Sequence, residues 1–348
     1  AVAIRNRIVA KVSRVEVATK FLSPPPAEKL RELAAQGLIT SEEAELAALI
    51  PMADDLTAEA DSGGHTDNRP AIALIPTMIA LRDRLAEKFA YRRPIRVGAA
   101  GGISTPTSVA AAFAMGAGYV VTGSVNQACQ EAGTSAPVRE MLAGAEQADV
   151  IMAPAADMFE MGVKVQVLKR GTMFAMRGAK LYEIYATCKS MAEIPAATRE
   201  MLEKTIFRAS LDEIWKQTRE FFLKRDPRQV ERAEKDPKHQ MALVFRWYLG
   251  MASRWANAGE PGRQIDYQVW CGPAMGAFNE WTRGTFLAKP ENRGVETVAF
   301  NLLYHAAVAT RIRMLKLQGV AIPAAVERRV PLPLDEIKAR LGRERSAA

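Results

Sequence analysis

Two short apolar segments of this chain end abruptly in glycine and other small residues, and this pattern restricts the fold more than any other feature. The segments are Val97–Ile103 (VGAAGGI) and Tyr119–Ser124 (YVVTGS), and a helical pattern follows the second. Exposed backbone N–H groups at a strand end, next to a helix N-terminus, form a binding site for a phosphate. One strand earlier, the loop Asp61–His65 (DSGGH) adds a titratable histidine. Together these segments predict a flavin or nucleotide site on a β/α barrel.

Strand and helix patterns alternate through the first 150 residues. Strands are predicted over residues 7–13, 55–60, 95–99 and 119–122, and the intervening helices are predicted to end near residues 21, 36, 49, 89 and 116. Thr40 with Glu43, three residues later, forms a capping box. Pro106 suits the first turn of a helix whose N-cap is Ser104 or Thr105. Such alternation is typical of a parallel α/β sheet or barrel.

The number of strands predicts only part of a barrel. A β/α barrel needs eight strands and about 250 residues, whereas four βα units precede a change of character near residue 150. The fold class that we predict is therefore α/β: the C-terminal half of a TIM (β/α)8 barrel over residues 1–150, followed by a mainly helical extension over 151–348. We expect the N-terminal half of the barrel to be absent from this chain, and we find no clear strand alternation beyond residue 157.

Composition and cysteine usage favour a cytoplasmic protein. The three cysteines, Cys129, Cys188 and Cys271, are odd in number and widely spaced, so they predict neither a disulfide framework nor a metal site. The first residues lack a signal-peptide pattern. The uncharged stretch between Arg96 and Glu131 is broken by glycines and Pro106, so we do not expect it to span a membrane.

The net charge of +8 is distributed unevenly. Residues 161–348 contain 32 Lys and Arg against 20 Asp and Glu, an excess of +12, while residues 1–160 contain 15 against 19. The basic part favours an acidic partner, and the alternative is a solvated helical surface. No aromatic-interleaved basic motif is present, which argues against nucleic acid as the partner.

Four longer phrases resemble one known family. They are residues 58–70 (AEADSGGHTDNRP), 121–128 (VTGSVNQA), 153–162 (APAADMFEMG) and 255–260 (WANAGE). They resemble the PfaD subfamily of FMN-dependent enoyl reductases, which share a TIM barrel with the 2-nitropropane dioxygenase and nitronate monooxygenase enzymes. The PfaD subfamily consists of the trans-acting enoyl reductases of polyunsaturated fatty acid and trans-acyltransferase polyketide synthases. The resemblance runs from about residue 3 to beyond residue 320.

The resemblance implies roles for the residues around the two glycine segments. The FMN phosphate would lie in two backbone cradles, and the loop before His65 would be shaped against the flavin. The cofactor-binding residues implied in this way are Lys11, Ser62, Gly63, Gly64, Ala100, Gly101, Gly102, Gly123 and Ser124. Alternatively, Lys11 could have a surface role, and Gly101 with Gly102 could simply form a tight turn.

His65 is the candidate catalytic residue. The resemblance places it beside the flavin, where an imidazole can polarise a thioester carbonyl or relay a proton. Asp61 and Asp67 are candidates to orient it, although solvated loop carboxylates fit the same pattern. His239 and His305 lie in helical patterns without partner spacing, so we interpret both as structural.

The implied reaction is reduction of an enoyl thioester carried by an acyl carrier protein, with FMN as cofactor and NAD(P)H as reductant.

The expected partners are that carrier protein and other synthase components, and the open sheet edge of a half-barrel favours self-association. The aromatic clusters near Trp247, Trp255 and Trp270 are expected mostly in the core and at interfaces; the alternatives are that some cover the active site or bind the carrier. Two alternatives remain: a nitronate monooxygenase-type flavin oxidase, and a non-catalytic docking subunit.

Overall fold

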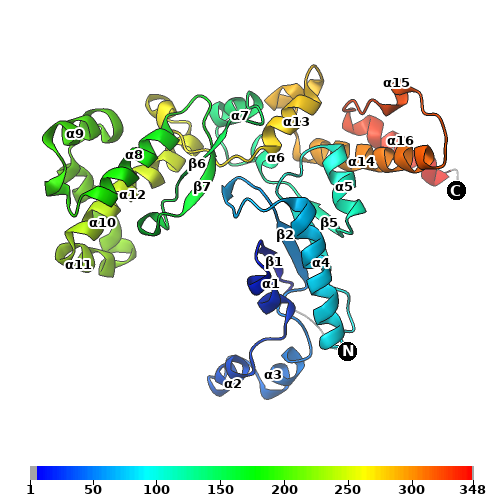
Figure 1. Cartoon of the computed structure of the whole chain (residues 1–348), viewed down its shortest axis with the longest axis horizontal. Helices are drawn as coiled ribbons and strands as arrows, with labels where there is room; N and C mark the ends of the chain where they lie inside the picture. The colour runs from blue at the N-terminus through cyan, green and yellow to red at the C-terminus, as the bar shows by residue number, and fades with distance from the viewer. Residues whose placement is uncertain (1–5, 347–348) are drawn as a thin grey trace. The chain divides into compact units, whose positions relative to one another are not determined.

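A computed structural model of the chain describes residues 6–346, with side chains as far as Gly342 (Figure 1). Contacts divide the chain into two compact units. Unit 1 contains the described residues up to Ser62, then Thr66–Asn126, and the chain from Ala277 onward. Unit 2 contains Gly63–His65 and Gln127–Gly276.

Unit 1 is built on a parallel four-stranded sheet. Its strands are β1 (Val9–Val12), β2 (Asp55–Glu59), β4 (Arg96–Ala100) and β5 (Tyr119–Val121), in the order β1-β2-β4-β5. The helices between and after them are α1 (Val15–Leu22), α2 (Ala27–Ala35), α3 (Ser41–Ala47), α4 (Ala71–Lys88), α5 (Pro106–Ala114) and α6 (Ser124–Gln127), the last of which reaches into unit 2. Each strand pairs with the next one along the chain, as in consecutive βα units of a barrel. The predicted half of a TIM barrel is confirmed.

Burial and capping explain why these elements form where they do. Leu56, Ala58, Val97 and Ala99 are at most 1% exposed, because helices cover one face of the sheet and pack against small and branched side chains. The predicted capping box at the start of α3 is present. The helix α5 begins with Pro106 after a capped N-terminus, as expected.

The C-terminal helices belong to the same unit as the parallel strands. They are α14 (Val295–Leu317), which packs against α5, α15 (Ala324–Glu327) and α16 (Leu334–Ser346), preceded by the short turns η5 (Phe286–Ala288) and η6 (Pro290–Asn292). The compact units therefore change near residues 126 and 276. The predicted boundary between residues 1–150 and 151–348 was placed where the sequence pattern changes from alternating strands and helices to mostly helices. This division into domains stays a prediction.

Unit 2 contains a small antiparallel sheet that we did not predict. Its strands are β3 (Gly64–His65), β7 (Lys164–Leu168) and β6 (Val150–Pro154), in the order β3-β7-β6. The expectation of no strand pattern beyond residue 157 was wrong for β7, a short strand in which Lys164 is exposed and the other four residues are buried. This hairpin pairs through β7 with the strand that carries His65.

The rest of unit 2 is helical, as predicted. Its elements are α7 (Ala136–Ala143), η1 (Phe159–Met161), α8 (Phe174–Thr187), η2 (Met191–Glu193), α9 (Ala196–Met201), η3 (Leu202–Phe207), α10 (Leu211–Arg225), α11 (Pro227–Lys235), α12 (Pro237–Ala258), η4 (Pro261–Asp266) and α13 (Ala274–Thr282), which continues into unit 1. Phe159, Phe207, Phe245 and Tyr248 are buried together in the core, and Trp247 and Trp255 pack against them. The aromatic cluster is thus a core feature.

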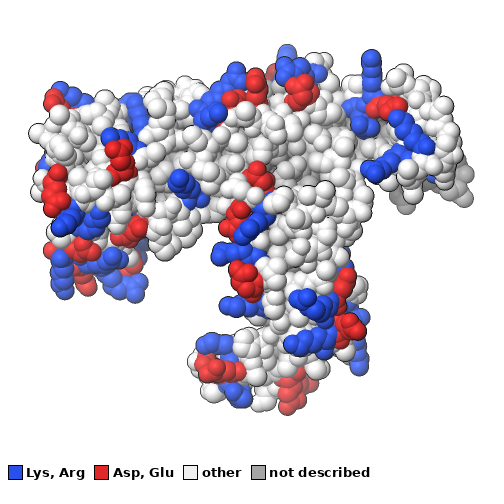
Figure 2. Space-filling model, viewed as in Figure 1, with Lys and Arg blue, Asp and Glu red and all other residues white. Residues whose placement is uncertain are grey.

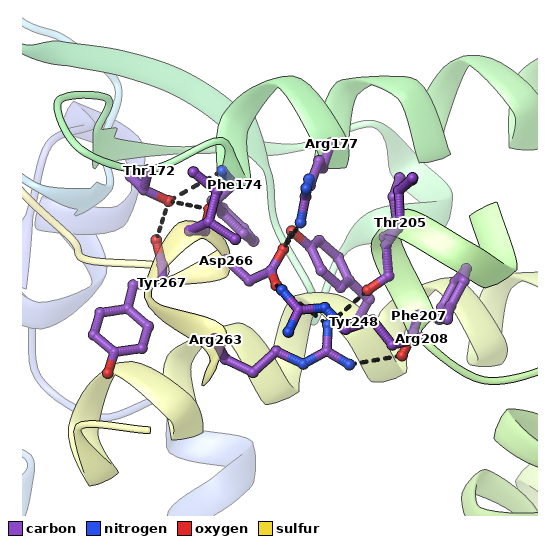
Figure 3. A network of polar contacts seen from close by, with 12 residues as sticks. Thr172, Phe174, Arg177, Thr205, Phe207, Arg208, Tyr248, Arg263, Asp266 and Tyr267 are labelled. Atoms are coloured by element: carbon purple, nitrogen blue, oxygen red, sulfur yellow. Dashed lines mark hydrogen bonds and ion pairs between the residues drawn. The ribbon is translucent and has the colours of Figure 1, made fainter. Parts of the chain in front are cut away.

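A buried carboxylate ties three segments of this helical part together. Asp266 is fully buried and accepts a hydrogen bond of 2.9 Å from the hydroxyl of Tyr248. The guanidinium groups of Arg177, Arg208 and Arg263 point toward it from α8, the turn after η3, and η4 (Figure 3). A buried carboxylate is tolerated only when charges and hydrogen bonds compensate it. Burial, with the Asp266 charge, raises the pKa of the Tyr248 hydroxyl, which therefore keeps its proton.

Among the residues that the structure describes, no helix combines the length and the apolar character needed to cross a membrane.

Candidate functional site

The parallel sheet brings the two glycine segments to the same edge. Ala100 at the end of β4 pairs with Val121 at the end of β5. Gly101 and Gly102 follow Ala100, and Gly123 follows two residues after Val121. Because parallel strands all point the same way, both glycine turns lie at the carboxyl edge of the sheet, where α/β proteins bind their ligands.

Glycine is present at this edge for two different structural reasons: close packing of the backbone at one position and open space at two others. Gly101 and Gly102 both adopt the left-handed backbone conformation, with φ of +77° and +75°. A Cβ on Gly101 would lie 2.6 Å from the backbone carbon of Ala60, so Gly101 allows close packing. A Cβ on Gly102 or on Gly123 would meet no atom of the described chain within 4 Å. These two positions therefore leave their backbone open to a ligand.

A buried hydroxyl lies beside the same turn. Ser104 is 1% exposed, and its Oγ has no hydrogen-bond partner among the described residues. A buried hydroxyl without a partner costs free energy, which a ligand oxygen would offset. Ser124, which follows Gly123, is also buried. The open glycines and the buried hydroxyl fit a phosphate group, and sequence reasoning missed Ser104 although it lies only two residues after Gly102.

Lys11 lies at the end of β1 with its ammonium group on the carboxylate of Glu59, at the end of the neighbouring strand β2. Its side chain is more than half exposed. The lysine is therefore held at the carboxyl edge of the sheet by an ion pair between adjacent strands.

The two carboxylates expected near His65 have partners in unit 1. Asp61 accepts a hydrogen bond of 2.8 Å from the side-chain amide of Asn68. Asp67 accepts one from the hydroxyl of Ser13 and lies 3.4 Å from Nε of Arg14. The structure pairs His65 with a different carboxylate.

The loop before His65 is fixed in unit 2 by strand pairing and by two glycines. Gly64 and His65 form β3, which pairs with β7. A Cβ on Gly64, whose φ is +79°, would lie 2.5 Å from the ring of Trp270. A Cβ on Gly63 would lie 2.9 Å from the backbone of Cys271. Only glycine lets the loop approach this segment so closely.

The imidazole of His65 has two neighbours in unit 2. Its Nε2 lies 3.2 Å from Oδ2 of Asp157, and its ring centroid lies 5.7 Å from that of Trp270, with the two rings nearly perpendicular. The side chain is about one third exposed. Trp270 is itself held by Gln127, whose amide donates a 2.7 Å hydrogen bond to its carbonyl. Asp157 is a candidate site residue that sequence reasoning missed, and its only signal was its place in the phrase 153–162.

The predicted site residues thus fall into two sets. Lys11, Ser62, Ala100, Gly101, Gly102, Gly123 and Ser124 belong to unit 1, whereas Gly63, Gly64 and His65 belong to unit 2. In unit 1, strand pairing places Lys11 and Ala100 toward the same edge of the sheet as the glycine turns, and in unit 2 Gly63, Gly64 and His65 are consecutive residues.

His239 and Cys271 have local surroundings that account for them. His239 is buried between Glu160 and Gln229, at 2.9 and 3.0 Å. Burial raises the pKa of the Cys271 thiol to about 12, so it is not a reactive thiolate at neutral pH. No group of three or more metal-binding side chains occurs among the described residues.

Comparisons with known proteins place the chain in a family. Residues 188–267 match the family model described as "[Acyl-carrier-protein] S-malonyltransferase, inserted helical domain". One of the subunits of a polyunsaturated fatty acid synthase from Thraustochytrium is 50% identical, over 90% of this chain and 22% of its own length. The polyketide biosynthesis protein PksE of Bacillus subtilis is 47% identical, over 89% of this chain and 40% of its own length. The chain therefore spans about a fifth to two fifths of these curated relatives.

A solved structure matches over most of both chains. The enoyl reductase domain of MlnA, from the macrolactin biosynthesis cluster of Bacillus amyloliquefaciens, is 42% identical, with a TM-score of 0.85 over 89% of this chain and 69% of that domain. The match includes the parallel strands and the helical part, and it agrees with the family that the four sequence phrases predicted. The chain belongs to the PfaD-type enoyl reductase family of polyunsaturated fatty acid and polyketide synthases.

Proposed function

We propose that this chain functions in an FMN-dependent enoyl reductase that acts in trans on enoyl thioesters of an acyl carrier protein, with NAD(P)H as reductant. The observation that carries the proposal is the pair of open glycine positions, Gly102 and Gly123, at the ends of two adjacent parallel strands. Similarity to an enoyl reductase domain supports the same conclusion.

The residues at the carboxyl edge would hold the cofactor. The backbone N–H groups around Gly102 and Gly123 and the hydroxyls of Ser104 and Ser124 would bind the FMN phosphate. The Lys11 ammonium, held at this edge by Glu59, would add a positive charge near the anion. When bound, FMN that NAD(P)H has reduced supplies the hydride that adds to the β-carbon of the enoyl thioester.

His65 would supply the proton. After hydride addition, the α-carbon of the thioester needs a proton, and an imidazolium is a suitable donor near neutral pH. Asp157 on one ring nitrogen and the perpendicular ring of Trp270 limit the rotation of the imidazole. A donor with a fixed orientation transfers its proton more efficiently than a freely rotating one.

The basic part of the chain would bind the carrier. Residues 161–348 carry an excess of 12 positive charges, and acyl carrier proteins present acidic surfaces. The family model matched by residues 188–267 is named after an enzyme that uses an acyl carrier protein, which supports a carrier-binding role for this segment.

Kinetic assays of the purified chain with FMN test the function directly. We expect NAD(P)H oxidation that depends on an enoyl thioester, and His65→Ala should lower kcat by roughly 10²- to 10⁴-fold while FMN binding is unchanged. A nitronate substrate with oxygen consumption serves as the comparison. Oxidation that requires the nitronate and not the thioester would reject the proposal, and an unchanged kcat in His65→Ala would reject the role of His65.

A further inference from the structure

Asp157 and His65 form an ion pair that folding stability does not explain. The Asp157 side chain is 63% exposed and that of His65 is 34% exposed. Ion pairs this accessible to water contribute little to stability. A role for this pair in orienting the imidazole accounts better for its geometry.

The backbone around Asp157 is held rigidly although its side chain is accessible. It lies between β6 and β7, where the N–H of Ala155 donates to the carbonyl of Val163 at 2.9 Å. The carbonyl of Ala156, immediately before Asp157, accepts a 2.7 Å hydrogen bond from Nε of Arg246. Two residues after Asp157, Phe159 is buried in the aromatic core. The carboxylate therefore projects from a fixed loop.

A second contact holds the far end of the same loop. The buried ring of His239 places Nδ1 2.9 Å from Oε1 of Glu160, and its Nε2 lies 3.0 Å from Oε1 of Gln229 on α11. The left-handed Gly162 then turns the chain into β7, the strand that pairs with His65. Asp157 thus lies in the connection of the β6–β7 hairpin, and His65 lies on the strand β3, which pairs with β7 of the same hairpin.

The contact favours a hydrogen on one ring nitrogen of His65. Nε2 lies 3.2 Å from Oδ2 of Asp157, and an ionised carboxylate only accepts hydrogen bonds, so it favours the form of the ring with the hydrogen on Nε2. In the neutral ring, Nδ1 then has the lone pair. A carboxylate that fixes the tautomer of a catalytic imidazole, and supports its positive charge, is an established device of enzymes.

We propose that Asp157 is the positioning residue of His65 and that Nδ1 is the atom of His65 that exchanges the proton with substrate. The inference rests on the proposed function. In the protonated ring, the Nδ1–H bond breaks as the α-carbon–H bond forms from the electron pair that the former C=C bond leaves on that carbon. The ring returns to the neutral form with its hydrogen on Nε2, against Asp157, and takes its next proton from water at Nδ1.

The kinetic test compares Asp157→Ala and Asp157→Asn with the matched control Asp212→Ala. Asp212 is also exposed and paired, but with Arg199 on another part of unit 2. We expect the Asp157 variants to lower kcat roughly 10- to 100-fold with little change in KM, and Asp212→Ala to match the wild type. In a His65→Ala background, Asp157→Ala should have no further effect. An additive loss in the double variant would overturn the proposal.

A spectroscopic test does not depend on activity. The chain has three histidines, so their ring nitrogens can be assigned in ¹⁵N spectra. We expect neutral His65 to be the Nε2–H tautomer in the wild type and a mixture of both tautomers in Asp157→Ala. Identical His65 signals in the two proteins would overturn the inference. If the chain fails to reduce enoyl thioesters, the proposed function fails, while these spectra still decide the Asp157–His65 interaction.

Discussion

At the level of single residues, the buried His305 makes the folding stability of this chain depend on pH. It is 5% exposed on α14, between the rings of Trp281 and Tyr304, and its Nε2 has no hydrogen-bond partner among the described residues. Burial lowers the pKa of the imidazole, and the charges of Arg329 and Arg340 lower it further, against a backbone hydrogen bond with Val330 that raises it. The ring is therefore neutral in the folded chain at neutral pH.

This environment predicts a loss of stability on acidification. In the unfolded chain a histidine takes up its proton near pH 6.5, whereas the folded chain resists protonation of His305, so stability falls as pH decreases through about 6.5. The urea midpoint of the wild type should therefore fall between pH 7.5 and 5.5, and that of His305→Gln should fall less. Equal slopes for the two proteins would show that His305 does not contribute.

At the level of strands and helices, local sequence was enough for the parallel sheet. Each predicted strand overlaps an observed one, because a short apolar run that ends in small or polar residues is a local signal for a strand. Residues 95–99, for example, correspond to β4, Arg96–Ala100. The capping box at Thr40 and the position of Pro106 depend on neighbours three or four residues away, so they were also predictable.

The β6–β7 hairpin was missed because its strands are short and lie among helical patterns. A run of five residues is ambiguous between strand and helix by periodicity alone. What makes Lys164–Leu168 a strand is its pairing with β6 on one side and with Gly64–His65, about a hundred residues earlier, on the other. Such a long-range pairing leaves no local signal.

The candidate site also combines features with a local sequence signal and features that depend on long-range contacts. The glycine turns at the strand ends could be predicted, because an apolar run that stops at glycine is a local signal. The catalytic role of His65 depends on the family resemblance and stays a prediction. The partner of His65 could not be predicted, because Asp157 reaches it only through the hairpin. Ser104 was missed because a serine before a helix is usually read as a cap, whereas its neighbour Thr105 takes that role.

For the chain as a whole, charge is the feature most relevant to a partner. Figure 2 shows basic and acidic side chains interspersed over α10 and α11. Residues 188–267 contain 15 Lys and Arg against 12 Asp and Glu, so the excess of 12 in residues 161–348 is spread beyond the matched helical segment. A mixed surface of this kind favours a moderate electrostatic attraction rather than a single basic patch.

This distribution predicts how the reaction responds to salt. The KM for a carrier-bound enoyl thioester should rise as ionic strength increases from about 0.05 to 0.5 M, because salt screens attraction between exposed charges. The KM for a short thioester without a carrier is the control and should change little. A carrier-bound KM that does not depend on salt would argue against electrostatic docking.

The most direct test of the account is whether the glycine cradle binds FMN. The measurement is the visible absorption spectrum of the chain after incubation with FMN and gel filtration, for the wild type, Gly123→Ala and Gly133→Ala. A Cβ at either position meets no atom of the described chain within 4 Å, so both variants should fold. We predict flavin absorbance in the wild type and in Gly133→Ala, and its loss in Gly123→Ala. A colourless wild type, or equal absorbance in all three proteins, would contradict the account.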